Sequence, residues 1–372
     1  MFEEFHETIG NVSETINRHA KDLDRPVIGV MPAYFPMELI DAMGGYPVQL
    51  WGNNLPIESA DSHLQSYACS VVKSILELEL RGTASMVQAY VFTSLCDSLI
   101  NLREIYRRIF DKPTFEFGIP ITQTPEARKT YIEHIMQSVT QGLEEVTGNK
   151  LTPESLKSAA KTHHRTRELQ RELYAIRRQN PGKILNYDFY AVLKAGFFLP
   201  RTVYNQMLET LIQGLNAIEY QESNKVKIVH TGLVFDPIDI YQFMDELGLA
   251  IVDDDFANGW RSACKGELQT ENLVDGIAEY LFDNAPCCCI YNPKIDRHDY
   301  LVEKVKQSGA DGVLFWYINF CEPDAFDKPQ LAARLKEENI PTSSIDLELT
   351  MTNFDAVKTR ISAFYEMLEE RK

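Results

Sequence analysis

Three cysteines stand at the ends of predicted elements, where thiolate chemistry is plausible on physical grounds. Cys321 follows 313–320, an apolar and aromatic run typical of a strand buried on both faces. Pro323 then prevents further sheet pairing. Cys96 follows a second strand-like run, 86–95. Because ligands bind at the carboxyl ends of parallel strands, we expect both thiols at a ligand site.

Cys69 stands directly before 71–80, an apolar-rich run that looks helical. Helix N-termini carry partial positive charge and lower the pKa of a nearby thiol. We therefore expect Cys69, Cys96 and Cys321 to converge as thiolates. Three thiolates without a histidine suit iron–sulfur chemistry better than catalytic zinc. The alternative is three separate core cysteines, because free cysteine is among the most buried residue types.

The other cysteines and the polar clusters are expected to be structural. Residues 287–291 read as a strand, and neighbours on a strand point to opposite faces, so Cys287, Cys288 and Cys289 are expected in the core without iron. Cys264 is given no role. Residues 253–255, three aspartates after a predicted strand at 249–252, form either a solvated loop with a helix cap or a cleft-facing acid.

Composition restricts the class of protein. A chain of 372 residues is expected to form two or three packed units, and 24% charged with 44% hydrophobic residues are globular values. A net charge of −17 argues against nucleic acid or an anionic membrane as partner. No run of roughly 18 apolar residues and no signal-peptide core are seen. A cytoplasmic location is expected, where seven cysteines indicate metal binding or burial rather than disulfides.

Alternation of strands and helices organises the chain. Residues 1–122 and 225–372 each show a β-α-β-α pattern, which is the signature of a parallel sheet covered by helices. Residues 123–224 show long, charged, helix-period segments instead. The fold class is therefore α/β, with an N-terminal α/β domain, a helical domain and a C-terminal α/β domain. A cleft is expected between the two sheets, where Cys69 and Cys96 would face Cys321.

Short motifs in a fixed order then connect these cysteines to a known family. The members of this series are Pro-Ala-Tyr-Phe-Pro at 32–36 with Glu38, Gly-Tyr-Pro-Val-Gln-Leu-Trp-Gly at 45–52, Tyr-Ala-Cys-Ser at 67–70, Cys-Asp-Ser-Leu at 96–99, Val-Asp-Asp-Asp-Phe at 252–256 and Phe-Cys-Glu-Pro at 320–323. No single motif is specific, whereas the ordered set is. The series resembles the 2-hydroxyacyl-CoA dehydratase and benzoyl-CoA reductase family, and the likeness covers nearly the whole chain.

The resemblance implies a cofactor and partners. It implies one [4Fe–4S] cluster held by Cys69, Cys96 and Cys321, between two Rossmann-like domains. It also implies a related second subunit with its own cluster, and a separate ATP-hydrolysing iron–sulfur activator that injects single electrons at very low potential. The chain most resembles the smaller subunit, and the fourth ligand of the cluster is left open.

Two reactions follow from the resemblance. Tracts at 169–177 and 194–200 favour the aromatic-reductase branch, in which benzoyl-CoA is reduced to a cyclic dienoyl-CoA. The alternative is a radical dehydratase that converts a 2-hydroxyacyl-CoA to an enoyl-CoA. A second alternative is a non-enzymatic binding module, since two α/β lobes around a cleft also describe ligand-binding clamps. No catalytic residue is assigned.

An acyl-CoA substrate would need aromatic and basic residues beside the cluster, because it is apolar at one end and anionic at the other. Few cations stand near the three cysteines in sequence, which suggests that the partner subunit holds the phosphate end. This chain would then either bind the acyl group or only relay electrons. The candidate substrate-binding residues are Tyr34, Trp51, His63, Tyr67 and Trp316.

Overall fold

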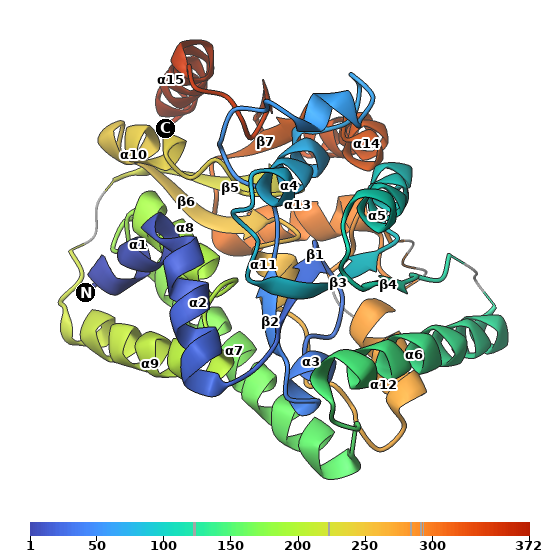
Figure 1. Cartoon of the computed structure of the whole chain (residues 1–372). Helices are drawn as coiled ribbons and strands as arrows, with labels where there is room; N and C mark the ends of the chain where they lie inside the picture. The colour runs from blue at the N-terminus through green and yellow to red at the C-terminus, as the bar shows by residue number, and fades with distance from the viewer. Residues whose placement is uncertain (122–123, 222–223, 283–284, 291, 293) are drawn as a thin grey trace.

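The computed structural model describes residues 1–121, 124–221, 224–282, 285–290, 292 and 294–372. It confirms the predicted class: an α/β protein with two four-stranded, all-parallel sheets and a helical segment between them (Figure 1). The division at 122, 224 and 225 stays a prediction, and residues 122 and 123 themselves lie outside the described ranges.

The N-terminal sheet has the strand order β2-β1-β3-β4. Its central strands are buried along most of their length, which explains their nearly continuous apolar sequence. Two helices precede the sheet, and three more connect its strands. The elements are α1 (Glu3–Gly10), α2 (Val12–Leu23), β1 (Val27–Met31), α3 (Glu38–Ala42), β2 (Tyr46–Gln49), the 3₁₀ turn Ala60–Ser62, α4 (Ser70–Leu80), β3 (Val87–Thr93), α5 (Asp97–Ile109) and β4 (Thr114–Phe117).

The C-terminal sheet has the strand order β6-β5-β7-β8. Short helices follow β6, and longer ones flank β7 and close the chain. The elements are β5 (Val226–Gly232), α10 (Ile240–Glu246), β6 (Leu249–Asp255), α11 (Trp260–Ala263), α12 (Leu273–Phe282), α13 (Arg297–Ser308), β7 (Gly312–Ile318), α14 (Glu322–Glu337), β8 (Thr342–Leu347) and α15 (Asp355–Glu369).

The two sheets share one topology. In each, the second strand pairs on one side of the first, and the third strand pairs on the other side. The order of strands therefore reverses between β1 and β3 and again between β5 and β7, and ligands of open α/β sheets bind at such switch points. Cys96 lies beyond the end of β3, and Cys321 lies beyond the end of β7.

Four long helices separate the sheets: α6 (Pro125–Thr147), α7 (Pro153–Gln179), α8 (Asn186–Ala195) and α9 (Arg201–Ala217). The predicted starts of α6 and α7 are confirmed, and Thr152 and Ser155 form a reciprocal capping box at α7. Helix α7 packs against α3 and α9 and also reaches β6, so it connects the two halves of the molecule (Figure 1). None of the helices in the described ranges has both the length and the apolar character of a membrane span.

Two strand assignments from the sequence are wrong. Residues 287–290 form a turn closed by a bridge between Cys287 and Ile290, and Tyr291 lies outside the described residues. The apolar run after Pro286 is too short to cross a sheet, so its composition is a poor guide. Strand β6 continues through Asp255, so the three aspartates belong to a buried strand rather than to a loop.

Close approach of β5 to β7 requires glycine at 232. A Cβ at this position would overlap the carbonyl oxygen of Trp316, which is backbone and has no freedom to rotate away. We expect Gly232→Ala to lower the free energy of unfolding by about 1–3 kcal/mol, the usual cost of overpacking. Gly266→Ala is the matched control, because no atom lies within 4 Å of a Cβ there. Equal denaturant midpoints for the two variants would contradict this account.

Candidate metal centre

One cavity lies between the carboxyl ends of the two sheets. It encloses about 580 Å³ of empty space, including its mouth, and segments beyond β1, β3, β5, β6 and β7 contribute to its wall. Cys69, Cys96 and Cys321 all line it, together with Cys289. The structure therefore brings the three sequence-predicted cysteines to one site, as the positions of the strand ends indicated.

Each of the three cysteines also precedes a helix. Cys69, Cys96 and Cys321 are the N-cap residues of α4, α5 and α14 respectively. Free N–H groups and the positive ends of three helix dipoles consequently meet at the cavity, which favours an anionic group there. The sequence predicts such a helix start only for Cys69, whereas the structure also begins α5 directly after Cys96 and α14 directly after Cys321.

Burial opposes ionisation of these thiols when no metal is bound. It raises the pKa of Cys69 to about 11, although the N–H group of Val72 partly offsets the effect. The pKa of Cys96 and that of Cys321 are also raised, again chiefly by burial. Metal binding therefore has to displace the thiol protons.

The spacing of the sulfur atoms bears on the kind of metal group. Three thiolates on one tetrahedral ion would lie about 3.8 Å apart, from a metal–sulfur bond of about 2.3 Å. Within the described part of the chain, the single set of three potential ligands whose atoms all lie within 4.8 Å is Cys287, Cys288 and Cys289. Cys69, Cys96 and Cys321 do not form such a set, so their sulfur atoms are not placed to share one tetrahedral ion.

Comparison with known proteins identifies the family. The model of the family described as 2-hydroxyglutaryl-CoA dehydratase, D-component, matches residues 32–368. The chain belongs to this D-component family. The resemblance inferred from the motifs is confirmed, and the chain is a subunit of an enzyme of the 2-hydroxyacyl-CoA dehydratase and benzoyl-CoA reductase type.

Alignments with curated relatives extend over almost the whole chain. It is 28% identical to the (R)-phenyllactyl-CoA dehydratase beta subunit of Clostridium sporogenes, over 99% of this chain and 98% of that protein. It is 27% identical to a subunit of the benzoyl-CoA reductase of Thauera aromatica, over 95% and 94%. It is also 27% identical to the beta subunit of the (R)-2-hydroxyglutaryl-CoA dehydratase of Acidaminococcus fermentans, over 99% of each chain. Their subunit names imply a heteromeric enzyme.

Two buried donors test whether the cavity of the D-component chain fits the iron–sulfur cluster that its family implies. The Trp51 indole Nε1 is buried in the wall and has no hydrogen-bond partner within the described protein, whereas the Tyr34 hydroxyl is buried there with a weak contact to the Cys287 thiol. An orphan donor costs about 1–3 kcal/mol unless a ligand accepts its hydrogen. Sulfides and thiolates are acceptors, so the residues present fit a cluster.

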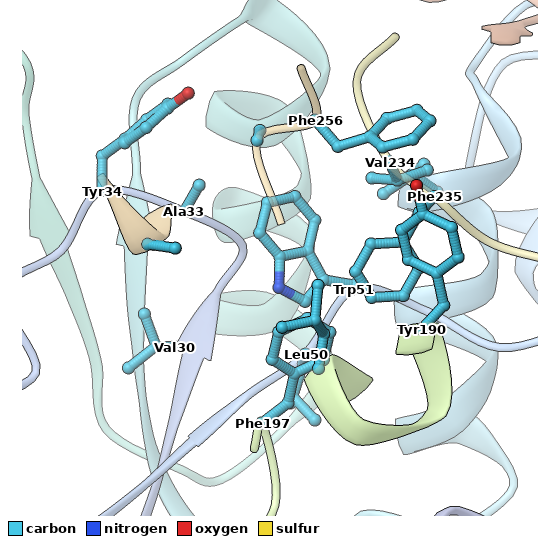
Figure 2. Close-up of a cluster of buried hydrophobic side chains, with 14 of the residues drawn as sticks. Val30, Ala33, Tyr34, Leu50, Trp51, Tyr190, Phe197, Val234, Phe235 and Phe256 are labelled. Atoms are coloured by element: carbon cyan, nitrogen blue, oxygen red, sulfur yellow. The ribbon is translucent and has the colours of Figure 1, made fainter. Parts of the chain in front are cut away.

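Backbone strain and aromatic packing hold these donors in place. Tyr34 has a φ of 67° and Phe320 a φ of 63°, a left-handed conformation that is unfavourable for bulky residues and recurs at ligand sites. Figure 2 shows Trp51 surrounded by side chains that come from both α/β parts and from the helical segment, including Phe197 and Phe235. The helical segment thus packs behind Trp51, whereas the residues that line the cavity come from the N-terminal and C-terminal parts.

The remaining candidate substrate residues lie elsewhere. Trp316 is buried in the core, where its indole donates to the carbonyl of Asp236 at 2.8 Å and packs on His230. His63 and Tyr67 are exposed on the segment before Cys69 and do not line the cavity, Tyr67 at 64% exposure. Of the five predicted residues, the structure brings only Tyr34 and Trp51 to the cysteines.

The aspartates of β6 are neither solvated nor cleft-facing, because all three are buried and do not line the cavity. Asp254 does accept from the backbone N–H of Trp260, the first residue of α11, at 3.0 Å, which keeps part of the expected helix-capping role. Asp253 accepts from Lys304 at 2.7 Å and from Arg178 at 2.8 Å. Asp254 accepts from the hydroxyl of Tyr174 at 2.7 Å. These contacts connect β6 to α7 and α13, so their role is to hold the helical segment against the sheet.

Sequence reasoning missed a buried basic pocket beside the cavity. Tyr34 lines both spaces, and the second contains Arg167, Arg201 and Lys265, each less than 10% exposed. Glu38 pairs with Arg167 at 2.7 Å and is the carboxylate of this group. The cations come from α7, α9 and the loop after α11, which are far from the cysteines in sequence. No local sequence pattern therefore predicts this basic pocket.

Lys265 gives this pocket a distinctive pH dependence. Burial lowers the pKa of its ammonium to about 7, although Cys264 partly opposes the shift. Between about pH 7 and 10 the unfolded chain therefore keeps a proton that the folded chain has lost, and stability rises with pH. Relative to Lys265→Met, wild type should gain about 1–3 kcal/mol between about pH 7 and 9 in denaturant unfolding. Lys306→Met, at an exposed lysine, is the control, and parallel pH curves for all three proteins would exclude the effect.

Proposed function

We propose that this chain is the smaller, cluster-binding subunit of a radical 2-hydroxyacyl-CoA dehydratase, which converts a 2-hydroxyacyl-CoA to an enoyl-CoA. The observation that carries the proposal is the convergence of Cys69, Cys96 and Cys321, each at a helix N-terminus, in one cavity. Two of the three relatives described above are dehydratase subunits. They support this reaction better than the ring reduction that the sequence tracts favoured.

Ring reduction is the second candidate. It rests on the 27% identity to the benzoyl-CoA reductase subunit of Thauera aromatica, which is close to the identity with the dehydratase subunits. In both cases a related second subunit with its own cluster and an ATP-hydrolysing iron–sulfur activator would complete the enzyme.

The residues of the cavity have separate roles in this proposal. Cys69, Cys96 and Cys321 would hold the cluster, which supplies single-electron transfer at low potential. Tyr34 and Trp51 would donate hydrogen bonds to its sulfur atoms, and such bonds raise the reduction potential of a cluster. The apolar wall excludes water, and the three helix N-termini stabilise negative charge.

Substrate recognition would be divided between the subunits. The acyl group would approach the wall formed by Tyr34 and Trp51, while the exposed His63 and Tyr67 lie on the segment that leads to Cys69. The phosphate end of coenzyme A would lie mainly on the partner.

Anaerobic purification tests the proposal. The full chain should be brown with about four irons, and a colourless, iron-free protein would instead support the binding-module alternative. Combined with its partner subunit, an activator and ATP, it should dehydrate a 2-hydroxyacyl-CoA and leave benzoyl-CoA unchanged. The reverse preference would establish ring reduction. Turnover by the isolated chain with ATP and a mild reductant would contradict the need for partners.

A further inference from the structure

We propose that Cys289 is the fourth thiolate ligand of the cluster, so that this chain holds it through four cysteines. This inference rests on the proposed cluster and concerns the ligand that the three strand-end cysteines leave open. Cys289 lines the same cavity as Cys69, Cys96 and Cys321, whereas Cys287 and Cys288 do not line it.

The repeated topology gives Cys289 the place that Cys69 has in the other half. Cys69 lies after the second strand of its sheet, directly before α4, the helix that leads into the third strand. The turn at 287–290 lies after the second strand of the C-terminal sheet, shortly before α13, which leads into β7. Each sheet thus offers one cysteine from the crossover between its second and third strands, and one from the end of the third strand.

Contacts within the turn distinguish its three thiols. The sulfur of Cys287 lies 3.3 Å from Nη1 of Arg261 and 3.5 Å from the backbone nitrogen of Cys289, and it also contacts the Tyr34 hydroxyl. Cys288 Sγ lies 3.9 Å from Cys289 Sγ. Cys287 therefore anchors the turn, and Cys289 is the member that reaches the cavity wall.

Two buried guanidinium groups lie behind the turn and can donate hydrogen bonds to it. Four thiolates give an oxidised [4Fe–4S] cluster a net charge of two minus. Arg261 and Arg297 are both buried here and share the carboxylate of Asp255, and Arg297 also pairs with Asp327, while Nη1 of Arg261 donates to the sulfur of Cys287. In addition, Nη2 of Arg297 is buried without a hydrogen-bond partner in the described protein. On binding, the Cys289 thiol would lose its proton to solvent and form the fourth iron–sulfur bond.

A cluster with four cysteines leaves no iron free to bind substrate. This chain would then relay electrons, and any direct contact between iron and the substrate would occur in the partner subunit. The inference thus assigns the relay role to the iron of this chain and leaves the acyl-group contacts at Tyr34 and Trp51 unchanged.

Mössbauer spectroscopy of the full chain, loaded anaerobically with ⁵⁷Fe, tests the assignment. Wild type should show only sulfur-coordinated iron. Cys289→Ala should convert about a quarter of the signal, one iron in four, to oxygen or nitrogen coordination. Cys289→Ser should give an oxygen-ligated iron as well, and it retains the size and polarity of the side chain. Cys288→Ala is the matched control and should match wild type.

Four other results of these experiments would contradict the assignment of Cys289 or the cluster itself. An oxygen-ligated iron already present in wild type would overturn the assignment, even if no variant folds. A spectrum unaffected by Cys289→Ala would overturn it too. Equal losses of a single extra metal in Cys287→Ala, Cys288→Ala and Cys289→Ala would show a separate ion on the turn instead. A chain that takes up no iron at all would refute the proposed cluster itself.

Discussion

Cys321→Ser will lower the iron content of the anaerobically purified chain below the wild-type value of about four per chain. Cys321 is 5% exposed at the N-terminus of α14, and it would be one of only two cluster ligands supplied by the C-terminal half. Its loss would leave that half attached through Cys289 alone. Serine is a poor iron ligand in place of a thiolate, because soft sulfur donors are what iron–sulfur clusters select.

The control for this experiment is Cys264→Ser. Cys264 is partly buried, and its thiol donates to the carbonyl of Arg261, but it does not line the cavity. It should retain the wild-type iron content and absorption spectrum. Iron and sulfide assays on both variants decide the matter, since full iron in Cys321→Ser would refute its assignment as a ligand.

Asp255→Asn will destabilise the fold by about 3–5 kcal/mol, the usual cost of removing one partner from a buried ion pair. Arg261 binds the carboxylate in two places at 2.9 Å, and Arg297 binds it at 2.6 Å. All three side chains are less than 10% exposed. The neutral amide would leave two buried guanidinium groups without their shared anion.

Asp346→Asn is the control, because that carboxylate is half exposed and pairs with Lys328 at 3.3 Å. A surface pair contributes about 0–1 kcal/mol, so denaturant unfolding should separate the two variants clearly. If Asp255→Asn were as stable as Asp346→Asn, the buried network would not hold the C-terminal half together.

The same ion pairs of Asp255 with Arg261 and Arg297 determine how its contribution to stability changes at acidic pH. Burial alone would raise the pKa of Asp255, but Arg261 and Arg297 outweigh burial and lower it below its ordinary value. A carboxylate with a lowered folded pKa stabilises the protein above its unfolded pKa of about 3.9 and loses that contribution only as the pH falls through the folded value. The contribution of Asp255 is therefore intact at neutral pH.

Local sequence patterns were sufficient for the sheets and for the three strand-end cysteines. Buried parallel strands such as β3 and β7 are apolar on both faces, and this makes them visible without any tertiary information. Ligand sites of such sheets lie at the carboxyl ends of the strands, so the sequence could assign Cys96 and Cys321 each to a site, and the expected cleft between the sheets brought them together.

Contacts between segments that are distant along the chain could not be predicted from local sequence patterns. Asp253–Asp255 looked like a solvated loop because three adjacent carboxylates are rarely buried, and the arginines and lysine that neutralise them come from α7, α11 and α13. The turn at 287–290 was mistaken for a strand because an apolar tetrapeptide has no periodicity to distinguish the two.

The meeting of three helix starts at one cavity has a mechanical consequence. A cluster bound to Cys69, Cys96 and Cys321 would join segments that lie far apart along the chain, and so would act as a covalent staple between the two sheets. Closing such long loops restricts the unfolded chain, which is how cross-links stabilise proteins. Oxygen that destroys the cluster would thus remove both the electron carrier and the cross-link between the two sheets. The free energy needed to separate the two halves would then be lower.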